Sequence, residues 1–185
     1  MLSIFIAVGN SLLDSGLTSS LIRTPVVTQK DCSTVFYFSL IGSIIIYLIL
    51  FLTAPLISKF YNQPVLTNVV RVYGISLIIN AFFAIQQTLL IKEMKFKTMT
   101  IIQIPSVVGG GIIGVVLAKM GYGVWSLVWM SLTNSFISTC LHWWYSAWRP
   151  ILLFNVNSFK SHFNYGYKIT LSGLIDKLYQ NIYTI

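Results

Sequence analysis

The sequence predicts an all-α protein, a polytopic bundle of transmembrane helices. Hydrophobic residues make up 56% of the 185-residue chain, charged residues only 9%, and the mean hydropathy is +0.79. A soluble domain carries roughly 25% charged residues, so this chain could not cover a water-facing surface. Several apolar stretches also exceed the ~20 residues that a helix needs to cross a bilayer.

Short polar breaks such as YNQP and KMGYG divide the chain into five apolar segments and the beginning of a sixth. We expect one transmembrane domain over residues 1–185. Its spans are predicted at about 1–22, 33–58, 66–91, 99–118, 124–147 and 167–185. The last span would be cut off by the end of the sequence.

The distribution of basic residues indicates how these spans are oriented. The first, third and fifth connections, with the start of the last span, hold eight basic residues, against three in or beside the second and fourth. The eight are Arg23, Lys30, Lys92, Lys95, Lys97, Arg149, Lys160 and Lys168, and the three are Lys59, Arg71 and Lys119. Because cytoplasmic loops carry the excess of positive charge, we expect the odd-numbered loops in the cytoplasm. The net charge of +8 therefore indicates topology rather than nucleic-acid binding.

A carboxylate interrupts the first predicted span. Asp14 shares a stripe with Asn10, Ser3 and Thr18, whereas leucine, isoleucine and phenylalanine occupy the other side. Intramembrane ionisable groups normally face a bundle interior or a water-filled cavity. Asp14 therefore either serves a cavity or coupling role, or caps a second half-helix after a break at DSG.

Three other spans carry a polar stripe of the same kind. The stripes comprise Tyr73, Ser76, Asn80 and Gln87 in the third span; Ser131, Asn134, Ser138 and His142 in the fifth; and Thr170, Gly173, Lys177, Gln180 and Thr184 in the last. Hydrogen bonds between helices could account for any one stripe. Four helices with one polar face each favour a shared polar cavity.

Two cations inside spans are candidates for binding an anionic group. Lys177 lies on the polar stripe with Gln180, so it could meet an anionic ligand or a carboxylate across the bundle. Arg71 lies about one turn inside its helix and could instead extend to the outer headgroups. The candidate cavity residues are therefore Asp14, Asn10, Asn80, Gln87, Arg71, Lys177 and Gln180.

The fourth span is built for close packing. Ser106, Gly110, Gly114 and Ala118 repeat at every fourth position, so the backbone of another helix can come near. Catalytic patterns are missing from the sequence: it contains no HExxH motif, no phosphate-binding glycine loop and no paired carboxylates. We therefore predict no enzymatic activity, no metal and no cofactor.

The stretches DSGLTSSLIR, RVYGISLIINAFFAIQQTLLIKEMKFK, GYGVWSLV and SGLIDKLYQNIYTI together resemble the Wzx-like polysaccharide and lipopolysaccharide flippases of the multidrug/oligosaccharidyl-lipid/polysaccharide exporter superfamily. The resemblance runs along essentially the whole chain. It implies a fragment that begins in the second helix and stops inside the seventh, about one lobe of a two-lobe transporter.

The resemblance also implies a function. Such proteins move undecaprenyl-diphosphate-linked oligosaccharide across the bacterial inner membrane by alternating access around a cationic cavity. The implied partners are lipid-linked oligosaccharide, membrane lipids and other cell-envelope polysaccharide assembly proteins. Two alternatives stay open: a drug or ion exporter of the same superfamily, and a structural membrane protein that transports nothing.

Overall fold

Five helices make up most of the part of the chain that the structure describes. This computed structural model describes residues 16–156, 158–160, 162–164, 166–169 and 172. The helices are, in order, α2 (Leu17–Arg23), α3 (Gln29–Phe60), α4 (Val65–Lys92), α5 (Phe96–Lys119) and α6 (Val124–Tyr145). All except α2 are long and apolar enough to cross a membrane. The predicted all-α membrane bundle is confirmed.

The number of spans differs from the prediction. The sequence predicts five complete spans, whereas four helices qualify among the described residues. The difference lies in the predicted span 1–22, because residues 1–15 fall outside the described part and α2 covers only Leu17–Arg23. Most of the predicted span 167–185 is likewise outside it.

Helix α3 begins earlier than residue 33 because a capping box defines its start. The Thr28 hydroxyl accepts a hydrogen bond from the backbone N–H of Asp31 at 3.3 Å. In return, the Asp31 carboxylate accepts one from the backbone N–H of Thr28 at 3.0 Å. The Asp31 N–H also donates to the Thr28 carbonyl at 3.1 Å, so the box joins side chain and backbone at the first turn of the helix.

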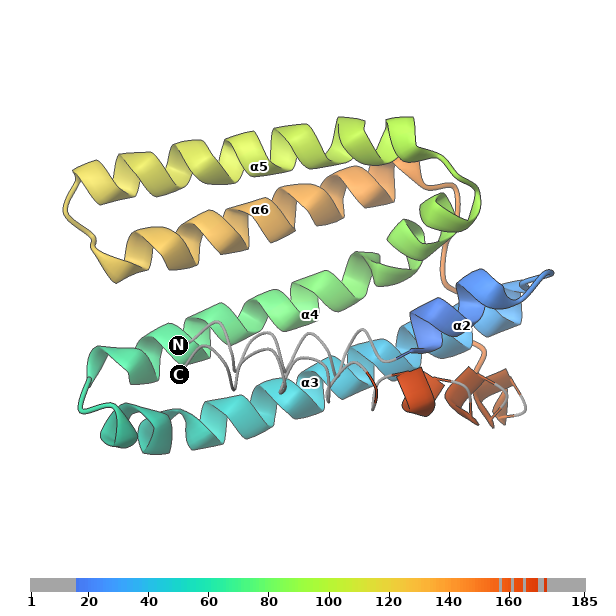
Figure 1. The fold of residues 1–185 in the computed structure, drawn as a ribbon, viewed down its shortest axis with the longest axis horizontal. Helices are drawn as coiled ribbons and strands as arrows, with labels where there is room; N and C mark the ends of the chain where they lie inside the picture. Colours follow the sequence, from blue (N-terminus) through green and yellow to red (C-terminus); the bar gives the residue numbers. More distant parts are fainter. Residues whose placement is uncertain (1–15, 157, 161, 165, 170–171, 173–185) are drawn as a thin grey trace.

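The long helices form two antiparallel hairpins (Figure 1), α3 with α4 and α5 with α6, and the hairpins pack through α4 and α6. The α2–α3 and α4–α5 connections and the end of α6 lie at one end of the bundle, at the right in Figure 1. The α3–α4 and α5–α6 turns lie at the other end. The odd-numbered connections that carry the basic excess therefore share an end.

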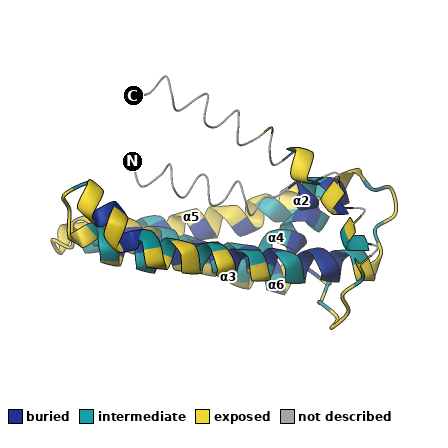
Figure 2. Cartoon of the chain, turned by 90° about the horizontal axis from the view of Figure 1, so that it is seen from below, coloured by how far each residue is buried: buried dark blue, intermediate teal, exposed yellow. Residues whose placement is uncertain are grey.

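The helices place small polar residues inside and large apolar residues outside. Ser43 of α3 is fully buried, for example, whereas Leu52 on the same helix is 72% exposed. Figure 2 shows exposed and buried positions alternating along the long helices. This arrangement suits a hydrocarbon surrounding, where small side chains let helices approach closely and lipid covers the large apolar ones.

The small residues of α5 bring its backbone against α6. A Cβ atom added at Gly110 would lie 2.7 Å from the carbonyl oxygen of Met130, and one at Gly114 would lie 2.9 Å from the Met130 Cβ. Ser106 is buried on the same face. The predicted close-packing role of this ladder is confirmed at these positions.

After α6 the chain returns across the beginning of α3. The backbone N–H of Ile151 donates to the Ser33 hydroxyl and that of Asn155 donates to the Thr34 hydroxyl, both at 3.1 Å. Further along, the buried His162 ring lies 2.8 Å, Nδ1 to Oγ, from Ser20 of α2. The returning segment, residues 146–156, 158–160, 162–164 and 166–169, is thereby attached to both α2 and α3.

A lysine of α4 holds the end of α2. The Lys92 ammonium donates to the backbone carbonyl of Leu21 at 3.1 Å and also to that of Thr24. These are carbonyls that the last turn of a helix leaves without intrahelical partners. A cation at this end also interacts favourably with the helix dipole.

Candidate functional site

A polar groove runs between α4, α5 and α6. Its cavity volume is about 310 Å³. Twelve residues line it: Tyr73, Asn80, Phe83 and Gln87 from α4; Met99, Gln103 and Ser106 from α5; and Ser131, Asn134, Ser135, Ser138 and His142 from α6. We refer to this set as the α4–α6 groove.

Helical periodicity explains why these side chains converge. Tyr73, Asn80 and Gln87 are separated by seven residues each, close to two turns, so they lie on one face of α4. The polar stripe predicted for α6 follows the same rule, and all four of its members line the groove. Ser76, the fourth member of the stripe predicted for α4, does not line the groove, because it is buried and its hydroxyl donates to the carbonyl of Tyr73. The other members of the two stripes, more than forty positions apart in the sequence, face one cavity.

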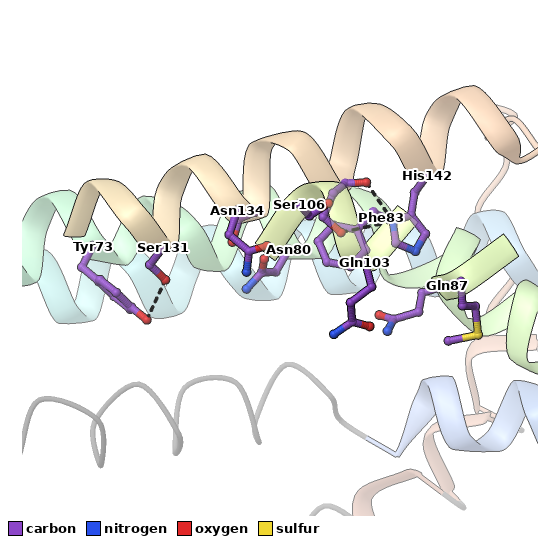
Figure 3. A pocket seen from close by; sticks show the side chains of 12 residues that line it. Tyr73, Asn80, Phe83, Gln87, Gln103, Ser106, Ser131, Asn134 and His142 are labelled. Carbon is purple, nitrogen blue, oxygen red and sulfur yellow. Dashed lines mark hydrogen bonds between the residues drawn. The ribbon is translucent and has the colours of Figure 1, made fainter. Parts of the chain in front are cut away.

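Four amide side chains define the chemistry of the groove. Asn80 and Gln87 come from α4, Gln103 from α5 and Asn134 from α6. Figure 3 shows Asn80 beside Asn134, and Gln103 beside Gln87 nearer to His142. None of the four amides hydrogen-bonds to another residue in the described part of the chain. Their donors and acceptors are therefore available to the contents of the cavity.

His142 is fixed in one tautomer. Its Nδ1 lies 2.8 Å from the backbone carbonyl oxygen of Ser138, which can only accept a hydrogen bond, so Nδ1 carries a hydrogen. The ring stacks on Phe83 with its centroid 4.7 Å away. The neutral ring leaves Nε2 as an acceptor, and this atom makes no hydrogen bond to any described residue.

At its other end, the groove is bounded by a hydrogen bond between helices. The Ser131 hydroxyl lies 3.1 Å from the Tyr73 hydroxyl (Figure 3), which ties α6 to α4. Beyond this pair a second hollow of about 300 Å³ continues between α5 and α6. Its lining adds Val107, Gly110, Leu127 and Met130, so it is more apolar than the α4–α6 groove.

The described lining of the α4–α6 groove contains no Asp, Glu, Lys or Arg. The candidate cation Arg71 is not among the lining residues, although it is on α4. Its guanidinium carbon lies 4.3 Å from the centre of the Phe51 ring of α3. The structure therefore brings Asn80 and Gln87 together in the groove and places Arg71 against α3.

The other candidates cannot be placed. Asn10, Asp14, Lys177 and Gln180 lie outside the described residues. Sequence reasoning in turn missed the contribution of α5, which supplies Met99, Gln103 and Ser106. The signal was present, because these residues are spaced by four and three positions and so share one helical face.

The groove can bind a neutral molecule that carries several hydrogen-bonding groups. Amides and hydroxyls both donate and accept, and His142 Nε2 adds an acceptor. Among the described residues, no group of three or more His, Cys, Asp or Glu could hold a metal ion. Binding of a polar ligand is the chemistry that this arrangement supports.

Comparison with known proteins gives a consistent set of matches. The family described as "Polysaccharide biosynthesis protein" matches residues 1–185. The chain is 25% identical over 174 residues to the teichuronic acid biosynthesis protein TuaB of Bacillus subtilis, covering 92% of this chain and 36% of TuaB. It is 23% identical over 184 residues to the lipopolysaccharide biosynthesis protein WzxC of Escherichia coli, covering 98% of this chain and 37% of WzxC.

A third relative is the succinoglycan biosynthesis transport protein ExoT of Rhizobium meliloti, 23% identical over 142 residues. That alignment covers 77% of this chain and 29% of ExoT. The chain thus spans about a third of the length of the relatives that it matches. No solved structure shows significant similarity to it.

Proposed function

The chain belongs to the polysaccharide biosynthesis protein family, and we propose that it forms part of a membrane carrier for polysaccharide precursors. In this proposal the cargo is an oligosaccharide linked to a lipid diphosphate. The carrier moves it from the cytoplasmic to the outer leaflet by alternating access. The names of TuaB, WzxC and ExoT, which refer to polysaccharide biosynthesis or transport, support this choice of cargo.

One observation supports transport more than any other: four amides from three helices face one cavity without partners in the described part of the chain. A polar group in a hydrocarbon surrounding is costly unless it is hydrogen-bonded. A protein that served only as a scaffold would gain nothing from such groups. A carrier needs them, since they replace the water that a hydrophilic cargo leaves behind.

The orientation follows from the basic residues at the shared end of the bundle. We propose that the α2–α3 and α4–α5 connections and the end of α6 face the cytoplasm, because short cytoplasmic loops carry more Lys and Arg. Trp144, which is 84% exposed, lies at this end. Its exposure suits a position at the headgroup level, where tryptophan is enriched.

The charged part of the cargo requires cations, because an unpaired charge cannot cross a region of low dielectric constant. The described lining of the groove supplies none. We therefore propose Lys177, with Gln180 beside it on the predicted stripe, as the ligand of the diphosphate. Asp14, with Asn10, is proposed to balance a cavity cation or to couple transport to a proton or another cation.

A test of this function uses a full-length relative that carries these residues. Lys177→Ala should reduce surface polysaccharide and leave lipid-linked precursor on the cytoplasmic leaflet, while Lys177→Arg should retain part of the function because it retains the charge. Lys168→Ala serves as the matched control near the membrane surface. Normal export by Lys177→Ala together with loss in Lys168→Ala would refute this assignment of the anion site.

A second arm tests the role of the carboxylate. Asp14→Asn should reduce export without reducing the amount of protein inserted in the membrane. Normal export in that variant would favour the capping role instead. If neither Lys177→Ala nor Asp14→Asn changes export, the roles proposed for both residues are wrong.

A further inference from the structure

We propose that the α4–α6 groove is a subsite for one uncharged sugar ring, and that it excludes acidic sugars and phosphates. This inference rests on the proposed function, because it assigns one part of the cargo to one part of the protein. The uncharged portion of the oligosaccharide would bind in the groove, and its anionic portion would bind elsewhere. The argument depends on the charge, the hydrogen-bonding groups and the size of the groove.

The first argument concerns charge. A carboxylate or phosphate that enters the groove must give up part of its hydration, and this costs more than it does for a hydroxyl unless a counter-ion compensates it. The twelve described lining residues include no Lys or Arg, and the nearby Arg71 contacts the ring of Phe51 instead. An uncharged sugar meets only the smaller cost of desolvating its hydroxyls, which hydrogen bonds in the groove can offset.

The second argument concerns hydrogen bonds. Each hydroxyl of a sugar donates one hydrogen bond and accepts others, so its site must offer both donors and acceptors. Each of the four amides provides an oxygen and an NH₂ group. The fixed tautomer of His142 adds Nε2 as an acceptor that no described residue uses. The groove can therefore satisfy a ring that carries several hydroxyls from three helices.

The third argument concerns size. Ligand sites in proteins typically measure ~300–1,000 Å³, and the groove, at about 310 Å³, is at the lower limit. Such a volume suits one sugar ring rather than a complete repeating unit. The adjoining hollow shares Tyr73, Ser131 and Asn134 with the groove. Its other lining residues are apolar side chains and a glycine, so it offers no further hydrogen-bonding side chain to a sugar.

The experiment measures protection of a cysteine in the groove, using the 185-residue chain reconstituted in lipid nanodiscs. Met99→Cys places the thiol in the lining without removing a hydrogen-bonding group, in a background where Cys32 and Cys140 are replaced by serine. Lys95→Cys, in the exposed α4–α5 connection, is the matched control for the reactivity of the reagent.

The probes are neutral hexoses (glucose, galactose, mannose and N-acetylglucosamine), their acidic analogue glucuronate, and pyrophosphate. At least one neutral hexose should slow the labelling of the Met99→Cys variant in a saturable manner and leave the Lys95→Cys variant unaffected. Glucuronate and pyrophosphate should not. Equal protection by glucuronate or pyrophosphate, or no protection by any hexose, would overturn the proposal.

Two further variants test which groups are responsible. Replacing Asn80 and Asn134 together by leucine, which is similar in size, should weaken protection by the hexose about tenfold, as expected for the loss of two or more hydrogen bonds. Gln103→Arg introduces a cation at an exposed position of the groove and should make glucuronate protective. Unchanged selectivity in Gln103→Arg would show that charge does not determine what the groove accepts.

These outcomes are separate from those of the export experiments. Protection by hexoses combined with normal export in the Lys177 and Asp14 variants would retain the sugar subsite and reject the proposed anion site and coupling role. Protection by pyrophosphate combined with impaired export in those variants would do the reverse.

Discussion

Substituting Gly110 by alanine tests the packing that holds α5 against α6. The added Cβ would lie 2.7 Å from the carbonyl oxygen of Met130 and 3.0 Å from the Cβ of Asn134. Both neighbours are backbone or the first side-chain atom, so neither can rotate away. To restore an ordinary contact of 3.4 Å, the distance to the carbonyl oxygen must increase by 0.7 Å, and the helices must separate.

The cost follows from that displacement. A gap of ~0.5–1 Å forfeits about a quarter to a half of the dispersion energy of each atom pair that it separates. Insertion of extra groups into a well-packed core typically costs about 1–3 kcal/mol, and we expect Gly110→Ala to lie in this range. For a chain of this size each kcal/mol corresponds to roughly 2–4 °C in Tm.

Thermal unfolding of the purified protein in detergent measures this effect, and Gly111→Ala is the matched control. A Cβ at Gly111 meets nothing within 4 Å, although the residue is on the same helix and next in sequence. Alanine also favours a helix over glycine by ~1 kcal/mol, so the control should be neutral or stabilising. Equal Tm values for the two variants would refute the close approach of α5 to α6.

Three other predictions concern the end of the bundle that carries the basic residues and the sidedness of the protein. Thr28→Ala should lower the free energy of unfolding by about 1 kcal/mol, since it removes the hydroxyl that pairs with Asp31 in the capping box. Denaturant unfolding in detergent would measure this as a lower midpoint at an unchanged m-value. An unchanged midpoint would contradict it. Lys92→Met should raise hydrogen exchange of the α2 amides about tenfold, because it removes the hydrogen bonds from an ammonium to the carbonyl of Leu21 in α2 and to that of Thr24, which follows the helix. Equal exchange in both proteins would show that the ammonium does not hold α2. The last prediction concerns variants in which the native cysteines are replaced by serine. In this background, Lys95→Cys should react with an impermeant reagent only from the cytoplasmic side, and Gln63→Cys only from outside. Labelling of Gln63→Cys from the cytoplasm would overturn the orientation.

The polar stripes of α4 and α6 could be predicted from sequence because they depend only on helical periodicity. Asn80 and Gln87 are seven positions apart, and the structure places both in one groove with the predicted stripe of α6. The ladder containing Gly110 was predictable for the same reason. Each of these features is a property of a single helix and follows from 3.6 residues per turn.

Features that depend on how two helices align could not be predicted in this way. Arg71 lies over Phe51 because of the register between α3 and α4, which no local pattern specifies. Gln103 was missed although it is spaced correctly with Ser106, since the small residues of its span suggested packing alone. The early start of α3 was a different kind of miss, because Thr28 and Asp31 have the spacing of a capping box in the sequence itself.

The attachment of the returning segment to α3 also has a consequence for the order of biosynthesis. Ser33 and Thr34 leave the ribosome long before their partners, which lie 118 and 121 positions later in the sequence. The Thr34 hydroxyl meanwhile donates to the carbonyl of Lys30, at 2.7 Å in its own helix. It can therefore enter the bilayer with its donor already satisfied and later accept the N–H of Asn155 with one of its two lone pairs. Insertion of α3 and its later attachment to the returning segment thus need not compete for the same hydrogen-bonding capacity.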